Sequence, residues 1–269
     1  MILCCSSPMV PVATLTEKAE LLSAWGYDAI AIFQPRDEWN DGVRRELAAL
    51  HERTGVRPVE FVLTSDIYGQ AMSGDGALRS ACRDMYREAV DVCADLGMVT
   101  EIEFEYRPQD PMPLFDPYQQ MAEDDEEQFI EFYSELLGRT DGSSAKVLLE
   151  PLNRYESRYL NSVEDNLRIL AKVTHPNAGL LPDTFHMSIE EDDIPDALRL
   201  ADHHVRHVHI GENNRLLPGR GALDWAGIFQ ALREIGYDGA VNLECSVSGN
   251  PHDTLPFAAR VMRELVDLR

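Results

Sequence analysis

Short β-rich runs alternate with helical patterns along the whole chain, and this alternation constrains the fold more than any other feature. Eight runs are predicted as strands: Ile2–Ser7, Asp28–Phe33, Val59–Thr64, Val99–Glu105, Lys146–Pro151, Ala178–Asp183, Val205–Ile210 and Ala240–Glu244. The clearest helical pattern is Leu78–Leu96, where apolar residues recur at steps of three and four. Eight strand–helix units within 269 residues predict an α/β fold, a single (β/α)8 TIM barrel.

A doubly wound open sheet is the alternative fold. Such a sheet usually carries a Gly-rich phosphate loop after its first strand, whereas Pro8-Met9-Val10-Pro11 follows the first strand here. No linker or break in composition divides the chain, so residues 1–269 are expected to form one domain. The longest irregular stretch, Arg107–Gln120, would follow the fourth strand and lie on the catalytic rim of a barrel.

The charge balance excludes several classes of partner. Acidic residues outnumber basic ones by 47 to 24, and the resulting net charge of −23 argues against binding nucleic acid or anionic membranes. No run approaches the ~20 apolar residues of a membrane span, and the first residues lack a basic secretory start.

The cysteines indicate a reducing compartment. Their number, five, is odd, and none forms a C-x-x-C pair, so we expect reduced thiols in a cytoplasmic protein. Cys4 and Cys5 are neighbours in a predicted strand, so their side chains should point to opposite faces.

Four side chains that can bind metal stand at or near the carboxyl ends of the fifth to eighth predicted strands. They are Glu150, Asp183, His209 and Glu244, separated by 33, 26 and 35 residues, each about one β–α unit. Four adjacent strands would bring three carboxylates and one imidazole to one place at the top of a barrel. This oxygen-rich set predicts a divalent cation such as Mn2+, Mg2+ or Co2+, with Zn2+ as a further candidate.

Polar residues that follow these strands add a predicted substrate site on the same rim. His186 and Arg215 are placed in loops from which they would donate to a developing enediolate oxygen, and Glu156 would accept from a sugar hydroxyl. Each of these residues alone more often has a structural role. Their common position beside the four candidate metal ligands, called the quartet below, favours a functional role.

For the other titratable residues, the sequence either leaves two roles open or predicts one position in the fold. Thr100–Glu105 puts three carboxylates on one face of the fourth strand, and Glu105 either lines the active-site mouth or forms a structural salt bridge. His203 and His204 are predicted at the surface. His207 shares the parity of His209, so we predict that it points inward as a partner of the metal ligands.

The second half of the chain resembles a known group of enzymes. The motifs are Glu150-Pro151-Leu152-Asn153-Arg154-Tyr155-Glu156, Asp183-Thr184-Phe185-His186-Met187, His209-Ile210-Gly211-Glu212-Asn213-Asn214-Arg215 and Gly236-Tyr237-Asp238-Gly239 leading to Glu244. They resemble the D-tagatose 3-epimerase and D-psicose (allulose) 3-epimerase group of the xylose isomerase-like TIM barrels. The resemblance covers Lys146 to Glu244, whereas the first half of the chain agrees only in its alternation of strands and helices.

The resemblance implies a divalent-metal-dependent ketose 3-epimerase or sugar isomerase, with Mn2+ the foremost metal. It implies metal ligands Glu150, Asp183, His209 and Glu244, and substrate contacts Glu156, His186 and Arg215. Glu150 and Glu244 would be the catalytic pair: one removes a proton beside the metal-chelated ketone to give a cis-enediolate, and the other returns one from the opposite face. It also suggests a homo-oligomer, a dimer or tetramer.

The first half departs from this group, and other functions therefore stay open. Cys4-Cys5-Ser6-Ser7-Pro8-Met9 stands where the epimerases usually present aromatic residues around the sugar. The second hypothesis is a metal-dependent lyase that acts on a 3-keto sugar or keto-glycoside by the same enolisation. A non-catalytic metal- or sugar-binding barrel is third. A DNA-repair nuclease of the endonuclease IV type is a distant fourth because of the net charge of −23.

Overall fold

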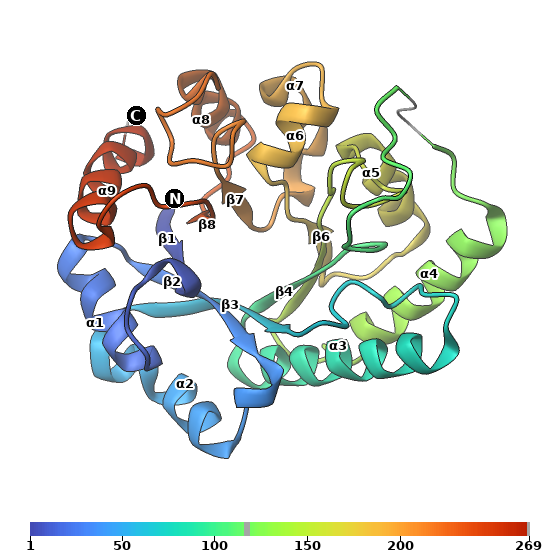
Figure 1. Cartoon of the computed structure of the whole chain (residues 1–269), viewed down its shortest axis with the longest axis horizontal. Coiled ribbons are helices and arrows are strands. Elements are labelled where there is room, and N and C mark those ends of the chain that lie inside the picture. Colours follow the sequence, from blue (N-terminus) through green and yellow to red (C-terminus); the bar gives the residue numbers. More distant parts are fainter. Residues whose placement is uncertain (116–118, 268–269) are drawn as a thin grey trace.

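A computed structural model describes residues 1–115 and 119–267, and all strand pairs within them are parallel. The strands are β1 (Ile2–Ser6), β2 (Ala29–Pro35), β3 (Arg57–Thr64), β4 (Val99–Ile102), β5 (Lys146–Leu149), β6 (Ala178–Leu180), β7 (Val208–Ile210) and β8 (Ala240–Leu243). They form one sheet in the order β6-β5-β4-β3-β2-β1-β8-β7. Figure 1 shows this sheet curving around a central space.

Short contacts join the two edges of the sheet. Isolated parallel bridges link Leu180 to Val205 and Asp183 to His209, between β6 and β7. The His209 N–H donates to the carbonyl of Pro182 over 3.0 Å. The predicted α/β TIM-barrel fold is therefore confirmed.

The helices lie outside the strands (Figure 1). They are α1 (Leu15–Trp25), α2 (Asp41–Thr54), α3 (Gly76–Leu96), α4 (Glu123–Gly138), α5 (Val163–Lys172), α6 (Thr184–Glu190), α7 (Ile194–Ala201), α8 (Trp225–Glu234) and α9 (Pro251–Asp267). Capping boxes at Thr14 and Ser162 satisfy the first backbone N–H groups of α1 and α5. Gly97 ends α3 in the left-handed region, with a φ of 73°, which glycine adopts at little cost.

Apolar packing is concentrated between the strands and the helices. Alternate strand residues such as Cys5, Phe61 and Leu63 belong to the large core cluster. Cys4 belongs instead to a small cluster with Ala29, so the two neighbouring cysteines do point to opposite faces. The buried members of this small cluster are Cys4, Ala29, Ala31 and Ala240, all with short side chains.

Several strands are shorter than the sequence predicts. β4 ends at Ile102, β5 at Leu149 and β6 at Leu180, because the chain leaves the parallel hydrogen-bond ladder where the rim begins. β7 begins at Val208 rather than Val205. Consequently Glu150 and Glu244 follow their strands directly.

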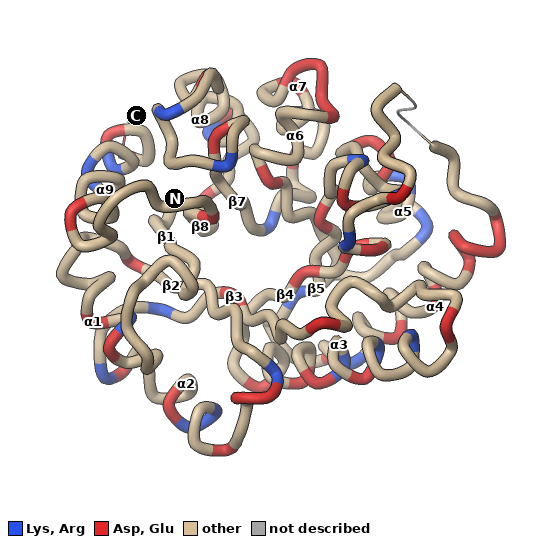
Figure 2. The backbone as a smooth tube through the Cα atoms, in the orientation of Figure 1, with Lys and Arg blue, Asp and Glu red and all other residues tan. Residues whose placement is uncertain are grey.

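Charged residues are spread over the helices, as Figure 2 shows, with acidic positions interspersed with basic ones. Several of these charges pair between neighbouring helices: Arg87 of α3, for example, pairs with Glu135 of α4 over 2.6 Å. Within the described residues, none of the helices has the length and apolar character that crossing a membrane requires.

Candidate functional site

Four side chains from the last four strand ends converge, as the sequence predicts. Glu150, Asp183, His209 and Glu244 each offer one ligand atom, and these atoms all lie within 4.8 Å of one another. Nδ1 of His209 is 2.9 Å from Oε2 of Glu244 and 3.6 Å from Oε1 of Glu150. Asp183 is fully buried, whereas the Glu244 side chain is 26% exposed and therefore accessible from the top of the barrel.

His209 is held from behind by Glu60, a residue of β3 that the sequence analysis missed. Nε2 of His209 lies 3.0 Å from Oε2 of Glu60, and His207 approaches the same carboxylate at 3.3 Å. Burial would raise the pKa of Glu60, but His209 and His207 hold that pKa well below its usual range. A carboxylate on Nε2 fixes the ring orientation and leaves Nδ1 available as a ligand. The signal for Glu60 was an acidic residue inside the apolar run Val59–Thr64.

The quartet fits a divalent cation. Nδ1 of His209 is buried and is counted in no hydrogen bond, although it lies 2.9 Å from Oε2 of Glu244. Burial raises the pKa of Glu150 to about 8, and repulsion from Glu244 and Asp183 acts in the same direction, although His209 opposes the shift. Three carboxylates and one imidazole nitrogen around a common point are the donor set of a Mn2+ or related site.

Asp183 is oriented by the helix that follows it. Its Oδ1 accepts from the N–H of Phe185 over 2.6 Å at the start of α6, and its Oδ2 accepts from Arg215 over 2.8 Å. Burial would raise the pKa of Asp183, but the charge of Arg215 and the hydrogen bond from the N–H of Phe185 hold it below its usual range. The carboxylate therefore stays ionised at the metal position.

Arg215 links two of the candidate ligands. Its guanidinium contacts Asp183 and reaches Oε2 of Glu244 over 3.2 Å, while its Cζ lies 4.7 Å from the ring centre of Phe185. The loop that carries Arg215 is fixed by the buried Glu212, which accepts from Nε1 of Trp225 over 2.7 Å. Arg215 is thus a positioned cation at the edge of the quartet.

His186 lies in helix α6, not in a loop as the sequence analysis expected, because Asp183 caps a helix that begins at Thr184. Its Nδ1 accepts from the backbone N–H of Asn153 over 3.2 Å, which favours the tautomer with the proton on Nε2, and Nη1 of Arg215 lies 3.5 Å from that Nε2. Burial lowers the pKa of His186, so the imidazole is neutral at pH 7. Asn153 also donates to Oε1 of Glu156 over 3.1 Å and so ties the two predicted substrate contacts together.

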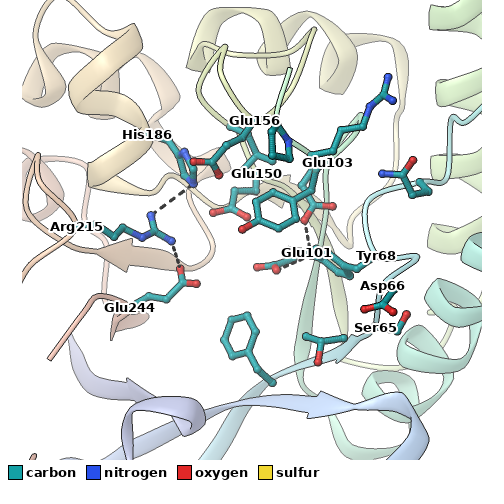
Figure 3. A pocket seen from close by; sticks show the side chains of 17 residues that line it. Ser65, Asp66, Tyr68, Glu101, Glu103, Glu150, Glu156, His186, Arg215 and Glu244 are labelled. Atoms are coloured by element: carbon teal, nitrogen blue, oxygen red, sulfur yellow. Dashed lines mark hydrogen bonds and ion pairs between the residues drawn. The ribbon is translucent and has the colours of Figure 1, made fainter. Parts of the chain in front are cut away.

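A cavity of about 690 Å³ opens beside the quartet. Figure 3 shows the predicted substrate contacts and both candidate catalytic glutamates around it. Its lining includes Glu150, Glu156, His186, Arg215 and Glu244 together with Thr64, Ser65, Asp66, Tyr68, Gln70 and Tyr106, and Figure 3 shows Ser65 and Asp66 on the side away from Arg215 and Glu244. The volume suits a small polar ligand with a substituent.

Residues 19–265 match the model of the xylose isomerase-like TIM barrel. The chain belongs to this family. It is 39% identical over 120 residues to a D-psicose 3-epimerase of Ruminiclostridium cellulolyticum, an alignment that covers 45% of this chain and 41% of that protein. A probable ketose 3-epimerase of Synechocystis is 29% identical over 259 residues, which cover 89% of this chain and 85% of the relative.

Solved structures share the whole fold of this xylose isomerase-like barrel. The 3-keto-D-glucoside 4-epimerase of E. coli superposes with a TM-score of 0.84 at 21% identity, covering 98% of this chain and 99% of that one. Its sequence identity is low, so this likeness bears on the fold alone.

In this xylose isomerase-like barrel, the segment after β4 carries one carboxylate away from the cavity. Glu105 accepts from Nε of Arg107 over 3.0 Å and from the N–H of Arg158 over 3.0 Å. Glu105 does not line the cavity, so the structure supports the salt-bridge interpretation of this residue.

Proposed function

We propose that this protein is a divalent-metal-dependent ketose 3-epimerase, a sugar isomerase that works by proton transfer through an enediolate. One observation carries the proposal: Glu150 and Glu244 approach the same atom, Nδ1 of His209, from β5 and β8, and both line the cavity. Two carboxylates on either side of a bound sugar are what inversion at one carbon requires. The family match and the named relatives support the same activity.

Glu150, Asp183, His209 and Glu244 would hold the cation. The bound cation supplies Lewis-acid stabilisation, which acidifies the carbon between a ketone and its neighbouring hydroxyl. We propose Mn2+ for this position because three of the four ligands are carboxylates.

The two glutamates carry the protons. One of Glu150 and Glu244 removes the proton from C3 and becomes a carboxylic acid, and the electron pair of the C–H bond moves into the enediolate. The other, protonated at the start, gives its proton to the opposite face of C3. Exchange with water then restores both groups for the next turnover.

The remaining side chains bind and orient the sugar. Nε2–H of the neutral His186 and the guanidinium of Arg215 donate to the oxygens where negative charge develops. Glu156, which lines the cavity and is held by Asn153, accepts from a sugar hydroxyl.

We also propose a single-domain, cytoplasmic homo-oligomer, a dimer or tetramer. The described cysteines are free thiols, which supports a reducing compartment. Met112, Leu114 and Phe115 are exposed near the rim, with Phe115 95% exposed, which supports coverage by another copy. Light scattering on the purified protein tests the oligomer: a monomer at micromolar concentration would contradict it.

The function is tested in D2O with the Mn2+-loaded protein and a panel of ketohexoses, ketopentoses and 3-keto-glycosides. NMR follows deuterium entry beside the carbonyl. We expect deuterium at C3 together with the appearance of the C3 epimer, and no epimer with Glu150→Gln or Glu244→Gln. Absence of exchange with every sugar would contradict the proposal.

A second candidate is a lyase that uses the same enolisation on a keto-glycoside. The observation that favours it is the far end of the cavity, where Ser65, Asp66 and Gln70 leave room for a substituent beyond the carboxylate quartet. Exchange accompanied by a released aglycone, detected in the same NMR experiment, would identify this reaction.

A further inference from the structure

A second group of carboxylates lies against the quartet. Glu101 of β4 and Glu103, just after that strand, each place an oxygen within 4.8 Å of an oxygen of Glu150 and of one another. All three side chains are buried, and Figure 3 shows the carboxyl groups of Glu101 and Glu150 pointing into the same space. Glu150 therefore belongs to two clusters at once, one with His209 and one with the glutamates from β4.

The hydrogen bonds at this cluster do not satisfy its carboxylates. The hydroxyl of Tyr68 is 2.7 Å from Oε1 of Glu101 and also contacts Oε1 of Glu103, although it carries a single proton. Tyr86 donates to the other oxygen of Glu103 over 2.6 Å. Oε2 of Glu101 is buried and has no hydrogen-bond partner at all. One donor is missing, and the oxygen without a partner belongs to a carboxylate of this cluster.

The carboxylates of Glu101 and Glu103 also lack a cationic partner among the described residues. Among residues 1–115 and 119–267, no arginine or lysine forms an ion pair with Glu101 or Glu103. Arg215 contacts Asp183 and Glu244 instead. A divalent cation in the quartet together with Arg215 carries three positive charges, and the quartet carries three negative charges, or two when one of its glutamates is protonated. At least one of the two carboxylates from β4 would then remain uncompensated in a buried site, which is costly.

We propose that Glu101, Glu103 and Glu150 form a second divalent-cation site, with Glu150 as a ligand shared between this site and the quartet. The ligands are carboxylate oxygens without an imidazole, a set that selects Mn2+ or Mg2+ over Zn2+. The cavity beside Glu101 and Glu103 leaves positions open for water or a substrate oxygen. The site concerns cation binding and does not rest on the epimerase activity.

The test counts Mn2+ ions per chain after equilibrium dialysis of the intact protein, by elemental analysis, and records the electron paramagnetic resonance spectrum. We expect two ions per chain and a spin-coupled spectrum, because both ions share Glu150. The double variant Glu101→Gln/Glu103→Gln should bind one ion and give the isolated six-line spectrum. Saturation of the wild-type protein at one ion would overturn the proposal, since a proton shared between Glu101 and Glu103 then accounts for the Tyr68 contacts.

A reciprocal variant and a matched control complete the test. Asp183→Asn should lose the ion of the quartet and retain one ion at the second site. Glu105→Gln changes a carboxylate of the same segment that is paired with Arg107 and Arg158, so it should still bind two ions. Two ions in a folded Glu101→Gln/Glu103→Gln variant, checked by circular dichroism, would overturn the assignment. Loss of an ion from Glu105→Gln would do so too.

Discussion

Glu60 of β3 and His209 of β7 meet across the interior of the barrel, with Oε2 of Glu60 3.0 Å from Nε2 of His209. The two residues are 149 positions apart in the sequence. Glu60 is fully buried and makes its close contacts with His209 and His207. The imidazole that completes the candidate metal site is thus oriented by a strand that contributes no ligand to the quartet.

Replacement of Glu60 by glutamine should weaken cation binding. The neutral amide holds Nε2 of His209 less firmly and lowers the basicity of Nδ1, and changes of this kind cost about 10- to 100-fold in metal affinity. Titration with Mn2+, followed by calorimetry, measures the loss. At saturating Mn2+ the variant should recover most of its kcat. An unchanged Kd in the folded variant would show that Glu60 does not support the ligand.

Removal of the cation should lower thermal stability. Glu150, Asp183 and Glu244 converge around His209, and without a cation their mutual repulsion opposes folding. A ligand that binds only the folded state at about 100 times its Kd adds about 2.7 kcal/mol. Thermal melts should therefore show a lower Tm after chelation and recovery with Mn2+. Identical melting curves for the chelated and loaded protein would contradict a structural contribution of the site.

His186 should act as a neutral donor. Because burial lowers the pKa of His186 and Asn153 donates to its Nδ1, we expect a neutral ring that presents the proton on Nε2 to the substrate beside Arg215. His186→Ala should lower kcat/KM by about 10²-fold or more, the size of a lost donor to a developing oxyanion. His186→Gln keeps an N–H donor and should lose less. Steady-state rates with the substrate found in the NMR panel measure both. Equal losses in the two variants would rule out this role.

Replacement of Glu105 by glutamine should lower the free energy of unfolding only slightly. Its partners Arg107 and Arg158 have side chains that are 52% and 42% exposed, so solvent screens the cationic side of both ion pairs. In Glu105→Gln the amide oxygen, at a side-chain position that is only 7% exposed, can still accept from the N–H of Arg158. Such pairs contribute about 1 kcal/mol or less. Urea unfolding of Glu105→Gln should show a correspondingly small decrease in the free energy of unfolding. A loss of several kcal/mol would mean that the carboxylate has a larger structural role.

The fold and the quartet were both accessible from the sequence, because each depends on spacing along the chain. Strand–helix alternation predicts a parallel barrel, and in a parallel barrel all carboxyl strand ends share one rim, so Asp183 and Glu244 must come close. The contact of Glu60 with His209 could not be predicted in this way. It depends on which strands face each other across the closed sheet and on how far each side chain reaches.

The local sequence also does not predict the residue at which the fourth strand ends. The repeat of acidic residues from Glu101 to Glu105 shows which side chains share a face, but not where the strand ends. Because β4 stops at Ile102, Glu103 and Glu105 lie in different surroundings: one meets two tyrosines and the other two arginines. Tyr68 and Tyr86 gave no signal in the sequence, since buried tyrosines are common in cores of this kind.

The central claim is that Glu150 and Glu244 work as two opposed acid–base groups. Exchange of the C3 proton for deuterium, measured on each pure epimer in D2O, tests this claim most directly. Glu150→Gln and Glu244→Gln, each shown to retain its Mn2+, are incubated separately with each pure epimer of the substrate. We predict that neither variant interconverts the epimers. Each should still exchange the C3 proton of one epimer only, the one whose proton faces the remaining glutamate, and the two variants should select opposite epimers. Epimerisation by either metal-loaded variant at the wild-type rate would contradict the two-carboxylate account.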